Sequence, residues 1–125
     1  MKQLEPLPSG LHVKNIGEAI VICPEGACDE ECTEALESII SQIESKPQTN
    51  IILDASKINY IETSGFRWII NQFRKLQEIG GSLIVAGLAG PAERAFKLLQ
   101  LDRYIPAAAT VEAALARVRK REQAG

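Results

Sequence analysis

Two short runs of almost continuous apolar residues constrain the fold of this chain more than any other feature. Residues 50–54 read NIILD and residues 82–88 read SLIVAGL, and both runs are rich in β-branched or aliphatic side chains. Runs of this kind are typical of strands that lie inside a sheet and are covered on both faces. A chain that contains them needs helices on both faces of the sheet, so the pattern predicts an α/β fold.

Amphipathic helical patterns alternate with these runs. The pattern between them predicts a helix over 65–79 that ends at the glycine pair 80–81. Asp29 is a suitable N-cap for an earlier helix that stops near Ser45, and Thr110 is one for the last helix. The inward stripe of the 65–79 helix recurs at steps of three or four residues and consists of Phe66, Ile69, Ile70, Phe73 and Leu76.

Shorter elements complete the expected order. A short helix that begins at Pro91 is expected to turn Ala95, Phe96 and Leu99 inward. Segments 24–28 and 55–61 are expected to be irregular connections. The remaining strands are expected at 11–16, 19–23 and 104–108, with a tight hairpin between the first two.

This order predicts one α/β domain with a mixed sheet of four to five strands and about four helices packed on it. A length of 125 residues is natural for a single domain with its own core. We expect residues 1–10 to be a lead-in, residues 11–118 to form the domain, and residues 119–125 to be a basic tail that frays.

Composition and cysteine spacing exclude several functional classes. The net charge of −2 provides no broad cationic field, so nucleic acid is not an expected partner. The spacing of Cys23, Cys28 and Cys32 lacks the Cys-x-x-Cys pairs of zinc sites, and buried, reduced structural thiols are expected instead. His12 is the single histidine. We therefore expect no metal, no cofactor, no catalytic residue and no enzyme activity.

No signal peptide or membrane-spanning segment is visible, so a cytoplasmic protein that does not insert into membranes is expected. Residues 15–45 contain acidic side chains but no Lys or Arg. This stretch is either a solvated helix face or an acidic docking surface.

The start of the 65–79 helix carries the strongest functional signal. Ser64 is placed to cap the helix, and Gly65 beside it leaves the hydroxyl unshielded. Helical spacing puts Trp68 on the same side as Ser64, opposite the inward stripe. Either a partly apolar strip faces solvent beside Ser64, or Trp68 tucks under a neighbouring loop and Ser64 is only a cap.

Five segments in this order resemble the STAS domain of anti-sigma factor antagonists. They are 51–54 (IILD), 60–66 (YIETSGF), 80–87 (GGSLIVAG), and 98–105 together with 111–115. The resemblance implies a bacterial signalling module that acts in transcription regulation by partner switching. The implied partner is an anti-sigma factor that is also a serine kinase of the histidine-kinase-like ATPase superfamily, and a serine phosphatase would reverse the modification.

The resemblance also implies the site residues. Ser64 lies at the usual phosphoacceptor position and Thr63 at the hydroxyl position before it, while Glu62 replaces the usual aspartate. Asp29, in the segment 26–29 (GACD), lies at the acidic position next to the binding surface. The implied partner surface comprises Asp29, Glu62, Thr63, Ser64, Gly65 and Trp68. An alternative is a cytosolic accessory subunit that docks on a lipid-transport ABC complex, as similar STAS domains do.

Overall fold

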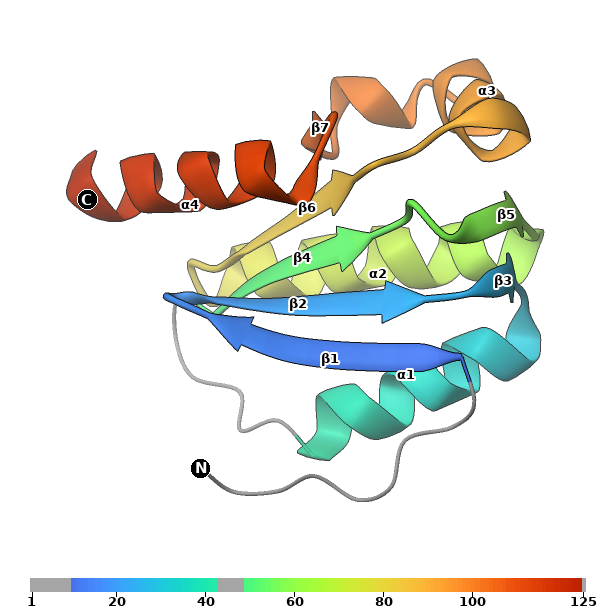
Figure 1. Cartoon of the computed structure of the whole chain (residues 1–125), viewed down its shortest axis with the longest axis horizontal. Coiled ribbons are helices and arrows are strands. Elements are labelled where there is room, and N and C mark those ends of the chain that lie inside the picture. The colour runs from blue at the N-terminus through green and yellow to red at the C-terminus, as the bar shows by residue number, and fades with distance from the viewer. Residues whose placement is uncertain (1–9, 43–48, 125) are drawn as a thin grey trace.

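The computed structural model describes residues 10–42 and 49–124, and these form a mixed five-stranded sheet with helices on both faces (Figure 1). The strand order is β1-β2-β4-β6-β7. The first strand is antiparallel to the second, and the remaining neighbours are parallel. The strands are β1 (Leu11–Ile16), β2 (Ala19–Pro24), β4 (Asn50–Asp54), β6 (Ser82–Ala86) and β7 (Ala107–Ala108). The predicted fold class is confirmed.

A second, two-stranded sheet extends one end of the main sheet. It pairs β3 (Gly26–Cys28) with β5 (Ile58–Ile61) in parallel. The expectation that segments 24–28 and 55–61 are irregular is therefore wrong. Each strand is too short to be recognised alone, and each forms because β2 and β4 already run side by side and deliver the two segments to the same place.

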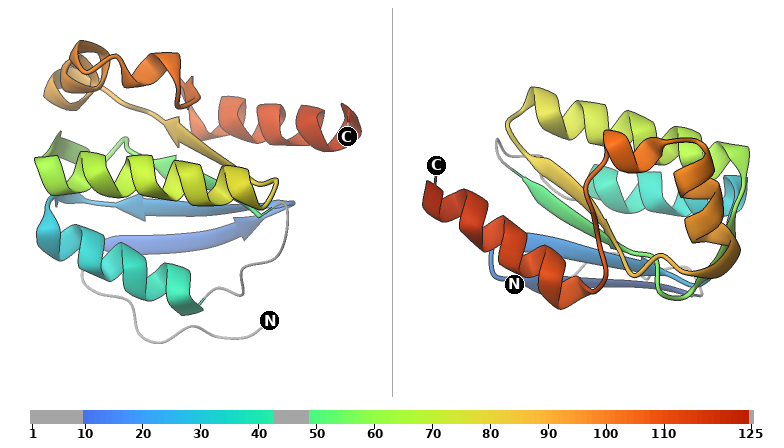
Figure 2. Two further views of the ribbon diagram at one scale, coloured as in Figure 1. Left: turned by 180° about the vertical axis from the view of Figure 1, so that it is seen from behind. Right: turned by 90° about the horizontal axis from the view of Figure 1, so that it is seen from above.

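Within the described residues, four helices pack on the two sheets, and they include helices on both faces of the main sheet (Figure 2). The helices α1 (Glu30–Gln42) and α2 (Thr63–Glu78) lie together on one face, and α4 (Val111–Ala124) lies on the other. The helix α3 (Gly90–Leu98) lies near β5 and is followed by a short 3-10 turn, η1 (Leu101–Arg103). The predicted end of α1 near Ser45 lies outside the described residues.

The continuous apolar runs are explained by burial on both faces of the sheet. In β4, Ile51 and Leu53 belong to the core under α1 and α2, whereas Ile52 between them belongs to the core under α4. All three are at most 3% exposed. In the second core, Ala114 and Val118 of α4 pack on this face of the sheet.

The helix α2 buries a wider face than its apolar stripe predicts. Trp68 is only 5% exposed, and its Nε1 donates a hydrogen bond to Glu37 Oε1 at 2.6 Å. Gln72 is 3% exposed, and its Nε2 donates to the same oxygen at 2.7 Å. Of the two alternatives for Trp68, the solvent-facing strip is wrong and burial is right, although α1 and not a loop covers the indole and supplies a carboxylate for it.

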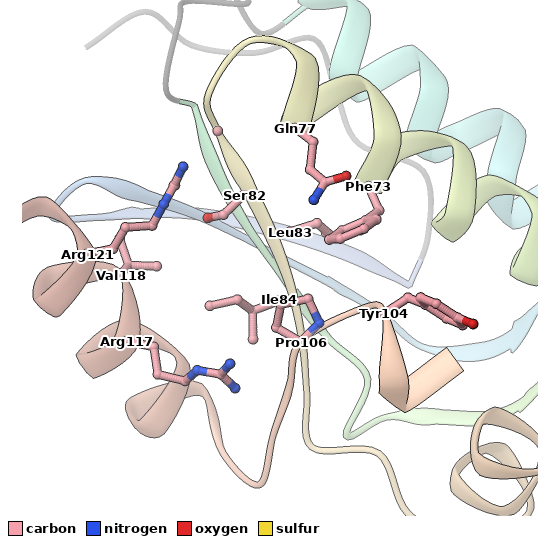
Figure 3. Close-up of a pocket in the computed structure, with 11 residues that line it drawn as sticks. Phe73, Gln77, Ser82, Leu83, Ile84, Tyr104, Pro106, Arg117, Val118 and Arg121 are labelled. Atoms are coloured by element: carbon pink, nitrogen blue, oxygen red, sulfur yellow. The ribbon is translucent and has the colours of Figure 1, made fainter. Parts of the chain in front are cut away.

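The basic end of α4 is anchored to the sheet. Arg121 Nη1 donates to Asn50 Oδ1 at 2.9 Å, and its other terminal nitrogen donates to the carbonyl of Gly80. Asn50 is 2% exposed, and its Oδ1 also accepts from the Ser82 hydroxyl at 2.7 Å. Figure 3 shows Arg121 reaching from α4 toward the start of β6. In the described residues, α4 continues to Ala124, so it includes most of the segment expected to be a basic tail.

Replacing Glu37 tests the link between α1 and α2. Glu37→Ala removes the acceptor for the buried nitrogens of Trp68 and Gln72, and each unsatisfied buried donor is costly. We expect the free energy of unfolding to fall by about 2 kcal/mol in urea denaturation. Glu34→Ala, at another exposed glutamate of the same helix, is the control and should change stability by less than about 0.5 kcal/mol. Equal losses in both variants would contradict this role of Glu37.

Candidate functional site

The two sheets bring the predicted site residues together at one end of the molecule. Cys28 and Ile61 are paired at the ends of β3 and β5. Asp29 and Glu62, the next residue after each strand, therefore lie near each other. The Glu62 N–H also donates to the carbonyl of Cys28 at 2.9 Å. The helix α1 begins at Glu30 and α2 begins at Thr63. Both helix N-termini therefore lie at the same edge of the fold (Figure 1).

Ser64 lies inside the first turn of α2 and is not its cap. The N-cap is Glu62, Thr63 is the first helical residue, and the Phe66 N–H donates to the carbonyl of Glu62 at 3.1 Å. The prediction that Ser64 caps this helix is therefore wrong. The hydrogen bond from the Glu62 N–H to the Cys28 carbonyl holds Glu62 at the end of β5. The helix α2 therefore begins at Thr63, one residue before Ser64. Thr63 is exposed and Ser64 is half-buried.

Glu62 does not use its carboxylate to cap the helix. Instead, its Oε1 accepts a hydrogen bond from the Tyr60 hydroxyl at 3.2 Å. This hydrogen bond to the carboxylate raises the pKa of the Tyr60 phenol, and the negative charge of Glu62 adds to the effect. The first turn of α2 contains no acidic residue, unlike that of α1, which contains Glu30 and Glu31. The amides of the first turn of α2 are thus left without a side-chain cap.

Gly65 is required by close packing. A Cβ at this position would lie 2.5 Å from the Cys28 carbonyl oxygen and 2.8 Å from the Cys28 Sγ. Cys28 itself is 0% exposed. The absence of a side chain at Gly65 therefore lets the start of α2 rest directly on the end of β3, and it holds Ser64 in place.

Asp29 performs the capping role that the sequence predicts. Its Oδ1 accepts a hydrogen bond from the Cys32 N–H at 2.9 Å. Its carboxylate is half-buried and is committed to the start of α1. Trp68 lies under α1 and does not face the solvent beside Ser64.

Sequence analysis missed an apolar surface beside Ser64. Leu99, expected to face inward, is 54% exposed, and Leu98 is 83% exposed. The helix α3 ends at Leu98, and Gln100, with φ of 59°, turns the chain so that Leu101 enters the core instead. The adjacent leucines could have signalled this, because both cannot face the core from one helix. Leu99 shares a shallow depression with Tyr60, Ser64 and Arg67.

No helix in the described part of the chain is long and apolar enough to cross a membrane. Over residues 10–42 and 49–124, the structure places no group of three or more His, Cys, Asp or Glu where it could hold a metal ion.

Substituting Gly65 tests the contact with Cys28. Gly65→Ala should lower the free energy of unfolding by about 1–3 kcal/mol, because the new methyl group meets backbone and thiol atoms that cannot move independently. Chemical denaturation measures the loss. Ser64→Ala, one residue away, removes an incompletely buried hydroxyl that makes no cap and should cost less than about 0.5 kcal/mol. A Gly65→Ala protein as stable as Ser64→Ala would contradict the packing argument.

The bond between Tyr60 and Glu62 predicts a titration change. In a Tyr104→Phe background, which leaves Tyr60 as the single tyrosine, Glu62→Gln should lower the pKa of Tyr60 toward the usual phenol value. The sign follows because the variant removes a negative charge that disfavours the phenolate. Ultraviolet absorbance titration measures this pKa, and Glu30→Gln provides the control. An unchanged titration in Glu62→Gln would show that the two side chains do not interact.

Comparisons with known proteins agree with this architecture. The family model of the STAS domain matches residues 11–114. BtrV of Bordetella bronchiseptica, named as a candidate anti-sigma factor antagonist, is 24% identical over 106 residues, which cover 85% of this chain and 91% of BtrV.

Two solved structures share the fold. The crystal structure of TM1081 from Thermotoga maritima, a candidate anti-sigma factor antagonist, has a TM-score of 0.79 at 19% identity and covers 87% of this chain and 94% of its own. The anti-sigma factor antagonist SpoIIAA in its unphosphorylated form has a TM-score of 0.72 at 22% identity, covering 88% and 96%. The match to the family model spans most of the chain, and the chain therefore belongs to the STAS domain family.

Proposed function

We propose that this protein is an anti-sigma factor antagonist that works by phosphorylation-controlled partner switching. When Ser64 is unmodified, the protein binds an anti-sigma factor that is also a serine kinase of the histidine-kinase-like ATPase superfamily. Phosphorylation of Ser64 releases that partner, and a serine phosphatase restores the binding form. The protein is then a substrate of the kinase and not itself an enzyme, and it acts in the cytoplasm. The names of BtrV, TM1081 and SpoIIAA support this class of regulator.

The position of Ser64 in the first turn of α2 is the observation that carries the proposal. A phosphate there adds about −1.5 to −2 charges, which the positive end of the helix dipole and its free amides favour. The turn holds no acidic residue of its own, and Glu62 is bonded to Tyr60 instead of to the amides. Arg67, three residues further on, is exposed on the same depression as Ser64. The fold can thus accept the phosphate without rearranging.

The same charge is sufficient to separate two proteins. A partner carboxylate about 6 Å from the phosphate would meet about 2.8 kcal/mol of repulsion per unit charge at an effective dielectric near 20. That energy corresponds to about a hundredfold loss of affinity. A switch of this kind acts through local electrostatics and leaves the fold unchanged.

We assign the binding surface to the hydroxyl-bearing start of α2 and the apolar residues beside it. Thr63, Ser64 and Glu62 are accessible to a partner, and Leu99 adds exposed apolar area in the same depression. Exposed aliphatic side chains that cluster near a functional residue are typical of interaction sites. Asp29 and Gly65 contribute by positioning the two helix starts. Trp68 supports the surface from beneath, through its bond to Glu37.

Substitutions at Ser64 test the switch. Ser64→Asp should abolish capture of the kinase from native lysate, because it places a negative charge where the phosphate would be. Wild type and Ser64→Ala should both capture it, and mass spectrometry should find phosphate on Ser64 in the wild-type protein. Thr63→Ala tests the second acceptor and should remain phosphorylated at residue 64.

Two outcomes would contradict the proposal. Capture of the kinase by Ser64→Asp at the wild-type level would remove the switch. Capture of lipid-transport ABC subunits, independent of residue 64, would make the protein a docking subunit of a transporter. Thermal unfolding of Ser64→Asp provides the control, since its midpoint should stay near that of wild type.

A further inference from the structure

A cleft lies at the edge of β6 where the main sheet ends early. In the described part of the chain, β7 pairs only with Val85 and Ala86, so the first part of β6 has no strand on that side. Pro106 precedes β7 and has no N–H with which to continue the pairing. The helices α2 and α4 lie on either side of this edge (Figure 3). The cleft that they enclose has a volume of about 550 Å³.

The walls of the cleft are mostly apolar and include two aromatic rings. Phe73 of α2 is half-buried, and Tyr104, directly after the turn η1, is exposed. The other apolar side chains of the lining are Leu83, Ile84, Pro106 and Val118. A cleft of this volume with such walls is in the usual range for binding a small molecule. A ligand therefore needs an apolar body, and the two rings favour an aromatic one.

Two guanidinium groups give the cleft a positive charge. Arg117 and Arg121 lie one turn apart on α4, and both line the cleft. Arg117 Nη1 donates to the carbonyl of Ala107 at 2.9 Å, and Arg121 donates to Asn50 Oδ1 and to the carbonyl of Gly80. These bonds hold both groups in place, but all three acceptors are neutral. Within the described residues, neither arginine forms a salt bridge, and no Asp or Glu lines the cleft.

This charge favours an anionic group on the ligand. Like charges one turn apart on a helix repel each other, and a negative group beside them lowers that energy. A guanidinium has five N–H donors, of which the bonds to the protein use only a part. The remaining donors suit the oxygens of a carboxylate. Gln77 of α2 also lines the cleft, and its amide points toward β6 (Figure 3).

We propose that this cleft binds a small aromatic carboxylate of one or two rings. The rings lie against Phe73 and Tyr104, and the carboxylate accepts hydrogen bonds from Arg117 and Arg121. A carboxylate is favoured over a phosphate, because α2 turns its C-terminal half toward the cleft and offers no free helix N-terminus for a dianion. The site is separate from Ser64, which lies about 14 Å from Phe73 along the axis of α2 at 1.5 Å per residue. It does not depend on the proposed function.

Titration of the full chain with 1-naphthoate, followed by amide spectra in solution, tests the site. We expect saturable movement of the resonances of Ser82, Ile84 and Val118, and none at Ser64. The amide 1-naphthamide has nearly the same shape without the charge and should bind at least about tenfold more weakly, because hydrogen bonds to an ionised group are stronger. Inorganic phosphate carries charge without rings and should also bind at least about tenfold more weakly, since it buries no apolar surface.

A substitution in α4 separates the charge from the shape of the cleft. Arg117 is exposed, and its hydrogen bond in the described chain is to the Ala107 carbonyl. Arg117→Gln should therefore keep a thermal unfolding midpoint near that of wild type, weaken the binding of 1-naphthoate by about tenfold and leave that of 1-naphthamide unchanged. Arg119→Gln, exposed on the same helix but outside the cleft, is the matched control and should bind both probes as wild type does.

Several outcomes would overturn the proposal. The absence of saturable movement at Ser82 and Ile84, or movement at Tyr60 and Leu99 instead, would show that the cleft is not the binding site. Equal binding of 1-naphthoate and 1-naphthamide, or equal binding of 1-naphthoate by Arg117→Gln and wild type, would contradict the role of the charge. Phosphate that binds as tightly as 1-naphthoate would contradict the assignment to carboxylates. None of these measurements depends on whether Ser64 is phosphorylated or controls a partner.

Discussion

Burial of the central strands on both faces is the constraint on which the rest of the structure depends. Strand β4 sends Ile51 and Leu53 into one core and Ile52 into the other. Neither core could form without helices on its own side, which is why α1 and α2 cover one face and α4 the other. The parallel neighbours β2, β4 and β6 then carry their following segments to the same end of the sheet. The candidate functional site lies at that end.

The site itself depends on a close contact between strand and helix. Cys28 ends β3, accepts the Glu62 N–H and packs against Gly65, so the start of α2 is fixed by backbone atoms and by the absence of a side chain. Such a start is rigid without being capped by a side chain. The amides of the first turn therefore remain available, and a charge at Ser64 would change what a partner meets without changing the domain.

Polar residues that looked like surface features stabilise the packing of the helices. Glu37, in the acidic stretch that could have been a solvated face or a docking surface, accepts hydrogen bonds from Trp68 and Gln72 and joins α1 to α2. Arg121, in the expected basic tail, joins α4 to Asn50 and to the turn after α2 at Gly80. In both cases a charged group forms hydrogen bonds with polar side chains that are buried. Without a partner, these polar groups would lower the stability of the fold. These four hydrogen bonds hold helices on opposite faces of the same sheet.

Local sequence patterns predict the architecture and place Ser64 at the start of a helix. The apolar runs at β4 and β6, the caps Asp29 and Thr110, and the motif around Ser64 are local patterns with a local physical cause. Which faces of the elements are covered depends on tertiary contacts. Trp68 is buried because α1 lies beside α2, and β3 and β5 exist because the main sheet places them together. Leu99 is exposed because the chain turns at Gln100. These outcomes depend on contacts between segments far apart in the chain, which periodicity along one segment does not contain.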